Sequence, residues 1–331
     1  MSRYSFFCCI FLGFSCFGSE SDLLDSDYYS KSQSTYGGIG LIQIPTARFS
    51  NDGEFSFGIS TESPYNRLYA KVQFFPWLET VLRYTEGTYI PYNAGSAQTW
   101  KDKGLDVKFK FFEEGDTVPE LAVGFNDFGG TGAFSSEYIV ASKRVNNWDI
   151  TLGLGWGRLG GRAHISNPIG WLSDSYKTRG GGSRLGGTLN LGRLFTGENA
   201  SFFGGFEYYT SIPNLSVKLE YDPSNYSNLI GLEKTFDQAG DIFEVDSRFN
   251  IGLNYQLDIS QRDKIDFSLG FVRGNTFYVN LAVHTNLNLA GEPKYTAPPE
   301  ILNQPYLQPF PELDSDWQKY LSELIMWQMG N

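Results

Sequence analysis

The sequence predicts an all-β protein: an antiparallel up-and-down transmembrane β-barrel of about 12 strands, followed by a short C-terminal helix. Three observations support this prediction. Apolar and polar residues alternate with a period of two, as in strands whose successive side chains point to opposite faces. Many of these runs have the ~9–11 residues that cross a membrane when tilted. An N-terminal apolar stretch is typical of a secreted chain.

The first strands follow a turn at Asn51–Asp52–Gly53 and form an opening meander over 55–59, 68–74 and 78–84. Further alternating runs predict strands at 105–111, 121–125, 148–156, 215–221, 249–259, 265–271 and 277–287. Less regular runs cover 136–145, 185–195, 201–210 and 228–236. Residues 87–103 and 159–183 are expected to form longer loops.

The same alternation would suit a soluble β-sandwich, so the pattern alone leaves both folds open. Aromatic residues at strand ends favour the barrel, because such residues form girdles at membrane interfaces. They are Trp77, Tyr84, Trp148, Trp156, Tyr208 and Tyr221.

The chain divides into five segments by composition. Residues 1–18 read as a signal peptide, with Arg3 followed by an apolar run that is too short to span a bilayer as a helix. A polar, flexible leader is expected over 19–36 and the barrel over 37–289. A Pro-rich linker over 290–313 precedes an amphipathic helix over 314–331.

All three cysteines, Cys8, Cys9 and Cys16, lie in the first segment. Cleavage after Gly18 would leave a mature chain without disulfide chemistry or a thiolate metal site. The alternative is lipoprotein processing, with Cys16 as the lipid anchor.

The formal charge of −11 comes without any block of basic residues. Nucleic-acid binding requires clustered Lys and Arg, so the composition argues against it. Neither Gly129–Gly132 nor Gly180–Gly182 has the Lys-Ser/Thr of a phosphate loop, and no metal-ligand spacing is present. We therefore expect no cofactor and no metal.

Several stretches resemble the YjbH/GfcD-type outer-membrane proteins associated with exopolysaccharide and capsule production. The first is GLIQIPTARFSNDGEFSFGIS from Gly40, followed by PYNRLYAKVQFFPWLETVLRYTE from Pro64. Later ones are NPIGWLSDSYKTR from Asn167, FFGGFEYYTSIPNLSVKLEYDPSNY from Phe202, FNIGLNYQL from Phe249 and LGFVRGNTFYVNLAV from Leu269. The resemblance covers about 37–289, departs from the family at 227–246, and implies relatives that continue further and are often lipoproteins.

The polar face of the strands supplies the candidate site. The residues expected to line the lumen or contact polysaccharide are Lys71, Arg83, Lys108, Lys110, Lys218, Arg248, Tyr69 and Tyr278. Their charges could guide an anionic polymer, and the tyrosines could stack on sugar rings. The competing interpretation is a salt-bridged interior that simply fills the barrel.

The sequence contains few candidate catalytic residues. His164–Ile165–Ser166 has a His-x-Ser spacing that can join a base to a nucleophile, but it falls in a Gly/Pro-rich loop. His284 falls on the polar face of the last predicted strand, where we expect an ordinary hydrogen-bonded histidine.

The resemblance, together with the barrel pattern and the signal peptide, implies a non-catalytic protein of the bacterial outer membrane that acts in exopolysaccharide or capsule export or assembly. Its expected partners are membrane lipid, the polysaccharide and periplasmic or outer-membrane export proteins. The alternatives are an enzyme that modifies lipid or polysaccharide and a general porin for small solutes.

Overall fold

A computed structural model describes residues 31–92, 96–180, 191–226, 244–289 and 317–329. Met1–Leu289 and Ala290–Asn331 form two separate units, and the second contains helix α1 (Trp317–Met329). The predicted signal peptide, the anchor candidate Cys16 and the linker 290–313 lie outside the described residues. No helix in the described ranges is long and apolar enough to cross a bilayer.

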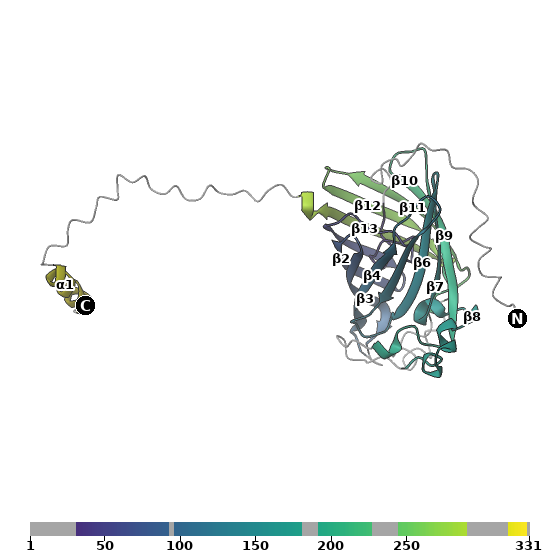
Figure 1. The fold of residues 1–331 in the computed structure, drawn as a ribbon, viewed down its shortest axis with the longest axis horizontal. Coiled ribbons are helices and arrows are strands. Elements are labelled where there is room, and N and C mark those ends of the chain that lie inside the picture. Colours follow the sequence, from purple (N-terminus) through teal and green to yellow (C-terminus); the bar gives the residue numbers. More distant parts are fainter. Residues whose placement is uncertain (1–30, 93–95, 181–190, 227–243, 290–316, 330–331) are drawn as a thin grey trace. The chain divides into compact units, whose positions relative to one another are not determined.

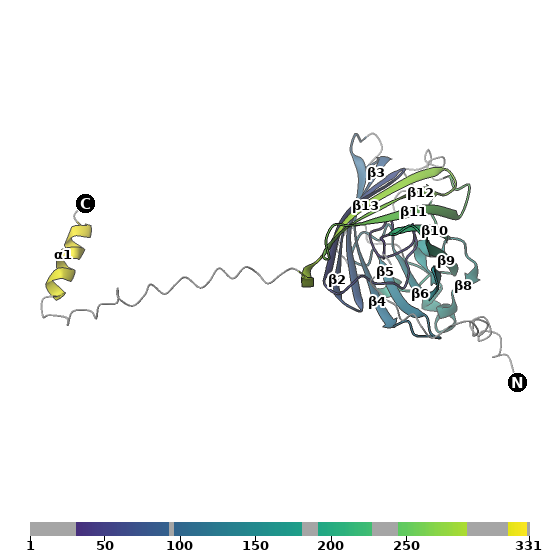
Figure 2. The ribbon, with the colours of Figure 1, turned by 90° about the horizontal axis from the view of Figure 1, so that it is seen from above.

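The first unit is a closed ring of twelve antiparallel strands (Figures 1 and 2). Each strand pairs with its neighbour in sequence, and β13 closes the ring onto β1 with Ser56 opposite His284. The wall strands are β1 (Glu54–Glu62), β2 (Tyr65–Phe75), β3 (Leu78–Pro91), β4 (Thr99–Phe112), β5 (Glu120–Asn126), β6 (Ser136–Val145), β7 (Trp148–Gly155), β9 (Asn199–Tyr209), β10 (Leu215–Tyr221), β11 (Phe249–Asp258), β12 (Asp263–Val272) and β13 (Thr276–Asn286). The two-residue strand β8 (Ile165–Ser166) pairs with the start of β9. The predicted fold class is confirmed, including the short C-terminal helix.

The alternation of residues separates two faces of the wall. Apolar side chains such as Ile59 and Leu82 point outward, with exposed fractions of 52% and 61%. Charged side chains such as Lys71 and Glu220 point inward and are 0% exposed. A water-soluble protein shows the opposite distribution, so this wall suits lipid outside and a polar interior.

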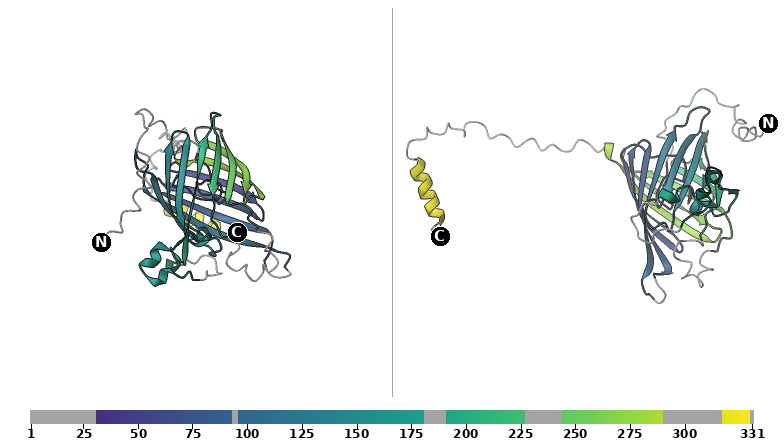
Figure 3. Two further views of the ribbon diagram at one scale, coloured as in Figure 1. Left: turned by 90° about the vertical axis from the view of Figure 1, so that its right-hand side faces the viewer. Right: turned by 60° about the horizontal axis from the view of Figure 1, so that its bottom comes forward.

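The loops at the two ends of the barrel differ in length (Figure 3). One end has short turns, such as Phe75 to Leu78 and Val145 to Trp148, and this is where β1 begins and β13 ends. The other end has the long connections between β7 and β9 and between β10 and β11. We call these the short-turn end and the long-loop end.

Three details differ from the sequence-based expectation. The loop expected over 87–103 is largely strand, because β3 runs on to Pro91 and β4 starts at Thr99. Residues 191–193 of the run at 185–195 form a 3-10 turn, while 181–190 and the run at 228–236 lie outside the described residues. Trp156 is 1% exposed, so it is not part of an interfacial girdle.

Candidate functional site

The barrel interior holds a segment of the chain's own N-terminal region, residues 31–50, which we call the plug. Almost all of its residues are buried, and it forms no regular strand. Residues 31–36, the last part of the leader expected over 19–36, thus lie inside the barrel. Residues 19–30 are outside the described residues. Gly37 sits at φ +93° against the Tyr69 ring, where a Cβ would lie 2.6 Å from a ring carbon. Only glycine suits both the backbone angle and the close approach.

Glu220 of β10 holds the plug by its backbone. Its carboxylate accepts hydrogen bonds from the amides of Ile42 (2.8 Å), Gln43 (2.9 Å) and Ile44 (3.2 Å). The side chain of Asn250 donates to the same carboxylate at 2.8 Å and so fixes its orientation. Amide hydrogen bonds to a charged acceptor are stronger than neutral ones, so this carboxylate is a main anchor of the plug.

Two of the predicted lumen lysines bind plug carbonyls. Lys108 Nζ donates to the backbone oxygens of Ile39 (3.2 Å) and Arg48 (2.7 Å) and pairs with Glu79 at 3.0 Å. Lys218 Nζ donates to the oxygens of Gly40 and Leu41, at 3.1 and 2.9 Å. Backbone carbonyls of the same chain therefore accept the hydrogen bonds that these lysines could otherwise donate to a ligand.

Arg48 anchors the end of the plug near the short turns. Its guanidinium binds both carboxylate oxygens of Asp149, at 2.7 and 2.9 Å. It also pairs with Glu120 at 2.8 Å and Glu114 at 2.5 Å. One plug cation thus meets three wall or turn carboxylates.

Tyr36 anchors the plug nearer the long loops through contacts between its ring and cationic groups. The guanidinium carbons of Arg67, Arg158 and Arg83 lie 4.3, 4.4 and 5.1 Å from the ring centroid. The ring also meets Phe134 edge-on, with centroids 6.0 Å apart. Cation–π contacts strengthen when they are shielded from water, and this cluster is buried.

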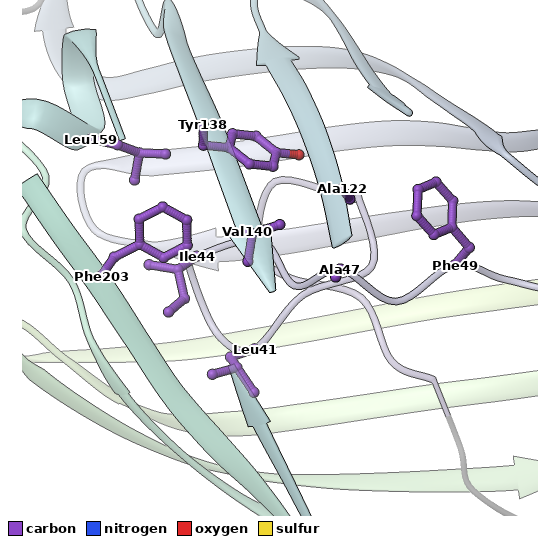
Figure 4. Packing of buried hydrophobic residues seen from close by; sticks show 9 residues of the cluster. All are labelled: Leu41, Ile44, Ala47, Phe49, Ala122, Tyr138, Val140, Leu159 and Phe203. Carbon is purple, nitrogen blue, oxygen red and sulfur yellow. The ribbon is translucent and has the colours of Figure 1, made fainter. Parts of the chain in front are cut away.

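Apolar plug residues complete the packing (Figure 4). Leu41, Ile44, Ala47 and Phe49 belong to one buried cluster with residues of the wall and the neighbouring loop. Those residues are Ala122, Tyr138, Val140, Leu159 and Phe203.

The other candidate residues of the sequence lie in or beside the same interior. Arg83 pairs with Asp106, and Lys71 pairs with Glu54 at 3.0 Å and with Ser50 of the plug. Lys110 pairs with Glu120 at 3.2 Å, and Arg248 donates to the Ser224 carbonyl at 2.5 Å.

The two candidate tyrosines cover glycines. Tyr69 lies across from Gly58, and its hydroxyl donates to Asn280 at 2.6 Å. Tyr278 lies across from Gly270 in the same way and is 1% exposed. Both rings are packed against backbone, so their contact with sugar stays a prediction.

Several residues that hold the plug were not predicted from the sequence, namely Ser142, Asn250, Arg67 and Arg158. The available signal was the run Ile39 to Ile44, which is rich in apolar residues but lies ahead of the first predicted strand.

The His-x-Ser pair lies at the long-loop end. His164 Nε2 lies 3.1 Å from the Tyr221 hydroxyl, and Nδ1 accepts from the Phe202 amide at 3.1 Å. Within the described contacts no carboxylate orients this ring, as a nucleophile–base pair requires. The expected hydrogen-bonded His284 lies inside the barrel between Glu54 (3.2 Å) and Asp266 (3.0 Å). No group of three or more His, Cys, Asp or Glu among the described residues could hold a metal ion.

The long connection after β7 is fixed by two polar side chains. Asn167 donates to the carbonyls of Tyr176, Phe195 and Gly197 and accepts from the Trp156 indole at 2.8 Å. Arg179 binds both oxygens of Glu137, at 2.7 and 2.8 Å. The loop folds back over Trp156, which is why this strand-end tryptophan is buried.

Asp127 at the long-loop end is a strongly perturbed carboxyl. Burial, with the neighbouring charge of Asp102 as a smaller cause, raises its pKa to about 7. Its Oδ2 accepts from the Phe134 amide at 3.0 Å, and its amide donates to Asp106 at 2.7 Å.

Comparison with known proteins gives the family. The family model described as exopolysaccharide biosynthesis protein YbjH matches residues 32–329. A protein of Escherichia coli K12 named "Uncharacterized lipoprotein YjbH" is 42% identical over 261 residues, which are 78% of this chain and 35% of the relative. This chain thus spans about a third of that relative's length.

Comparison with solved structures finds porins of low sequence identity. The KdgM porin covers 70% of this chain and 98% of its own, with 9% identity and a TM-score of 0.35. The NanC porin covers 71% and 99%, with 8% identity and a TM-score of 0.34. The apolar outer wall and the bacterial relative indicate a bacterial membrane protein. By its match along nearly the whole length, the chain belongs to the YjbH family of exopolysaccharide biosynthesis proteins.

Proposed function

We propose that this chain is a non-catalytic accessory protein of the outer membrane that acts in the export or assembly of exopolysaccharide or capsule. The observation that carries the proposal is the family match over 32–329 on a closed barrel with an apolar outer wall. The relative is more than twice as long as the matched part, so the activity of a longer protein is part of this proposal.

The contents of the barrel bear on how it would serve the polymer. Lys108 and Lys218 bind plug carbonyls, and the interior is occupied by residues 31–50. The barrel would then act as an anchor whose rims meet the polymer and its export proteins. Barrels of this class have short periplasmic turns and long outer loops, so periplasmic partners would dock at the short-turn end.

A deletion strain complemented in trans tests the proposal. Wild-type protein should restore the amount, chain length and cell attachment of surface polysaccharide, measured on purified polymer. A deletion that leaves all three unchanged would remove the proposal. His164→Ala and Ser166→Ala should complement as well as wild type, whereas loss of complementation by both folded variants would favour an enzyme.

The name of the relative bears on the N-terminus, since that protein is called a lipoprotein. We propose Cys16 as the acylated residue of this chain. Palmitate labelling should mark wild type and not Cys16→Ser. Labelling of both proteins, or of neither, would contradict this assignment.

A further inference from the structure

We propose that the plug closes a path through the barrel and that the unplugged barrel conducts small cations in preference to anions. This inference concerns the barrel itself and holds whatever polymer or partner the protein serves.

The first step is the fit of the plug. Eight strands make a barrel that side chains alone can fill, and sixteen or more leave an aqueous channel. With twelve strands this wall is wider than its own side chains fill, and residues 31–50 occupy the remainder. One gap between plug and wall, lined by Tyr36, Ile39, Glu79, Lys108 and Tyr138, has a volume of about 20 Å³. That is room for about one water molecule, so the packed plug blocks passage there.

The second step is how the plug is held. No wall strand pairs with it in a ladder among the described residues; its two β-bridges, Gln33 to Ile39 and Gly40 to Pro45, are internal. It is held by side chains, through the Glu220, Lys108, Lys218, Arg48 and Tyr36 contacts described above. Such contacts can be lost without breaking any hydrogen bond between wall strands, so plug and wall are separable.

The third step is the charge of the wall. Buried, inward-facing carboxylates on the described wall strands outnumber buried lysines and arginines there by ten to five. The carboxylates are Glu54, Glu62, Glu79, Asp102, Asp106, Glu120, Asp149, Glu207, Glu220 and Asp266, and the cations are Arg67, Lys71, Arg83, Lys108 and Lys218. Lys110 and Arg144 share this face and are partly buried, which still leaves an acidic excess.

The plug compensates part of this excess. Its charged residues are Lys31 and Arg48, and it contains no Asp or Glu. Arg48 neutralises Asp149 and Glu120, and the plug amides at Ile42, Gln43 and Ile44 solvate Glu220. Without the plug these carboxylates would face water, and a pore lined by negative charge favours cations.

The test removes plug contacts and leaves the wall intact. In the full-length variant Arg48→Glu/Tyr36→Ala, the new carboxylate repels Asp149, Glu120 and Glu114, and the truncation removes the ring from the three guanidiniums. The matched control is Arg262→Glu/Tyr89→Ala, since Arg262 pairs with Asp263 in an exposed turn and Tyr89 is 70% exposed. Each protein is checked for a closed barrel by its heat-modifiable gel shift and then recorded in a planar lipid bilayer under a KCl gradient.

Wild type and the control should stay closed, whereas the plug variant should show conductance steps with a reversal potential that favours K⁺. A folded plug variant that stays closed, a preference for Cl⁻, or wild-type conductance equal to that of the variant would each overturn the proposal. If the double variant gives no heat-modifiable band, the single variant Arg48→Gln is recorded in its place. Its open fraction should exceed that of wild type, and an equal open fraction would overturn the proposal.

Discussion

The inner and outer faces of the wall obey opposite rules, although they alternate residue by residue along the same strands. On β1, Ile59 exposes 52% of its surface to the outside, while its neighbour Ser60 is buried and donates to the Thr35 carbonyl of the plug at 2.7 Å. The outer face tolerates apolar side chains because lipid needs no hydrogen bonds. The inner face needs a partner for every polar group, and the plug provides many of them. The outer face of the barrel is therefore complementary to lipid in general, whereas the inner face is complementary to the plug of this chain.

The largest expected effect comes from a charge on the outer face. Ile59→Lys places an ammonium group among Leu68 and Leu281, the neighbours of Ile59 on either side. Lysine near the middle of a lipid-facing wall destabilises by about 2–4 kcal/mol. Unfolding in lipid vesicles with urea or guanidinium should show this loss.

The control for that charge is Ile212→Lys, the same change in the exposed turn between β9 and β10. It should shift the unfolding midpoint by far less. Equal losses in the two variants would mean that the outer face is not specified by lipid.

A smaller effect should follow from crowding the inner face. In Gly58→Ala the new methyl group would lie 2.5 Å from the Tyr69 ring, which is itself fixed by Asn280. Overpacking of this kind typically destabilises by about 1–3 kcal/mol. Gly115→Ala is the matched control, because nothing lies within 4 Å of its Cβ position. Unchanged stability of Gly58→Ala would show that the interior packs loosely.

The contribution of the long-loop end to folding stability should depend on pH. Burial holds the pKa of Asp127 at about 7, well above its ordinary value of 3.8. The folded state therefore binds this proton more tightly than the unfolded state, and stability falls as pH rises through about 4 to 7. Between pH 5 and pH 7.5 the loss should be about 2 kcal/mol.

Asp127→Asn should flatten this dependence, since asparagine keeps an acceptor for the Phe134 amide and tolerates the φ of 53°. Melting temperatures at the two pH values, for wild type and variant, measure the effect. A wild-type protein that is no less stable at pH 7.5 than at pH 5, or a variant that keeps the full difference, would contradict the assignment.

The smallest effect on stability is expected in an exposed turn, away from the inner and outer faces of the wall. Arg262 and Asp263 form an exposed pair at 3.1 Å in the turn between β11 and β12. Exposed ion pairs contribute about 0–1 kcal/mol and are screened by salt. Arg262→Gln should barely change the unfolding midpoint at physiological salt, and a loss above about 1 kcal/mol would give this turn a role that its contacts do not explain.

The two faces could be predicted from the sequence, because a period of two assigns each residue to a side whatever surrounds it. Strands 136–145 and 215–221 were predicted with the bounds that β6 and β10 have. The ends of β3 and β4 were not predicted, since β3 continues through Thr88, Tyr89 and Ile90, where a loop was expected.

The contents of the interior could not be predicted in this way. Residues 31–50 lack alternation, and their partners are far away in sequence: Ile42 and Glu220 are 178 residues apart. The sign and spacing of Lys108 and Lys218 predicted inward-facing cations, but not that backbone carbonyls of the same chain are their ligands. The prediction that Trp156 belongs to an interfacial girdle was wrong for a related reason. The loop that covers this residue is held by Asn167 and Arg179, which no local sequence pattern reveals.

The plug also constrains the order in which the molecule assembles. Residues 31–50 leave the ribosome before any wall strand, yet their anchors at Glu220 and Asn250 belong to β10 and β11. Contacts between such distant residues form slowly, because a long loop must close first. The earliest part of the chain must therefore wait for nearly the last strands. A folding factor that handles this barrel meets an unsheltered apolar run, Ile39 to Ile44, until the ring closes around it.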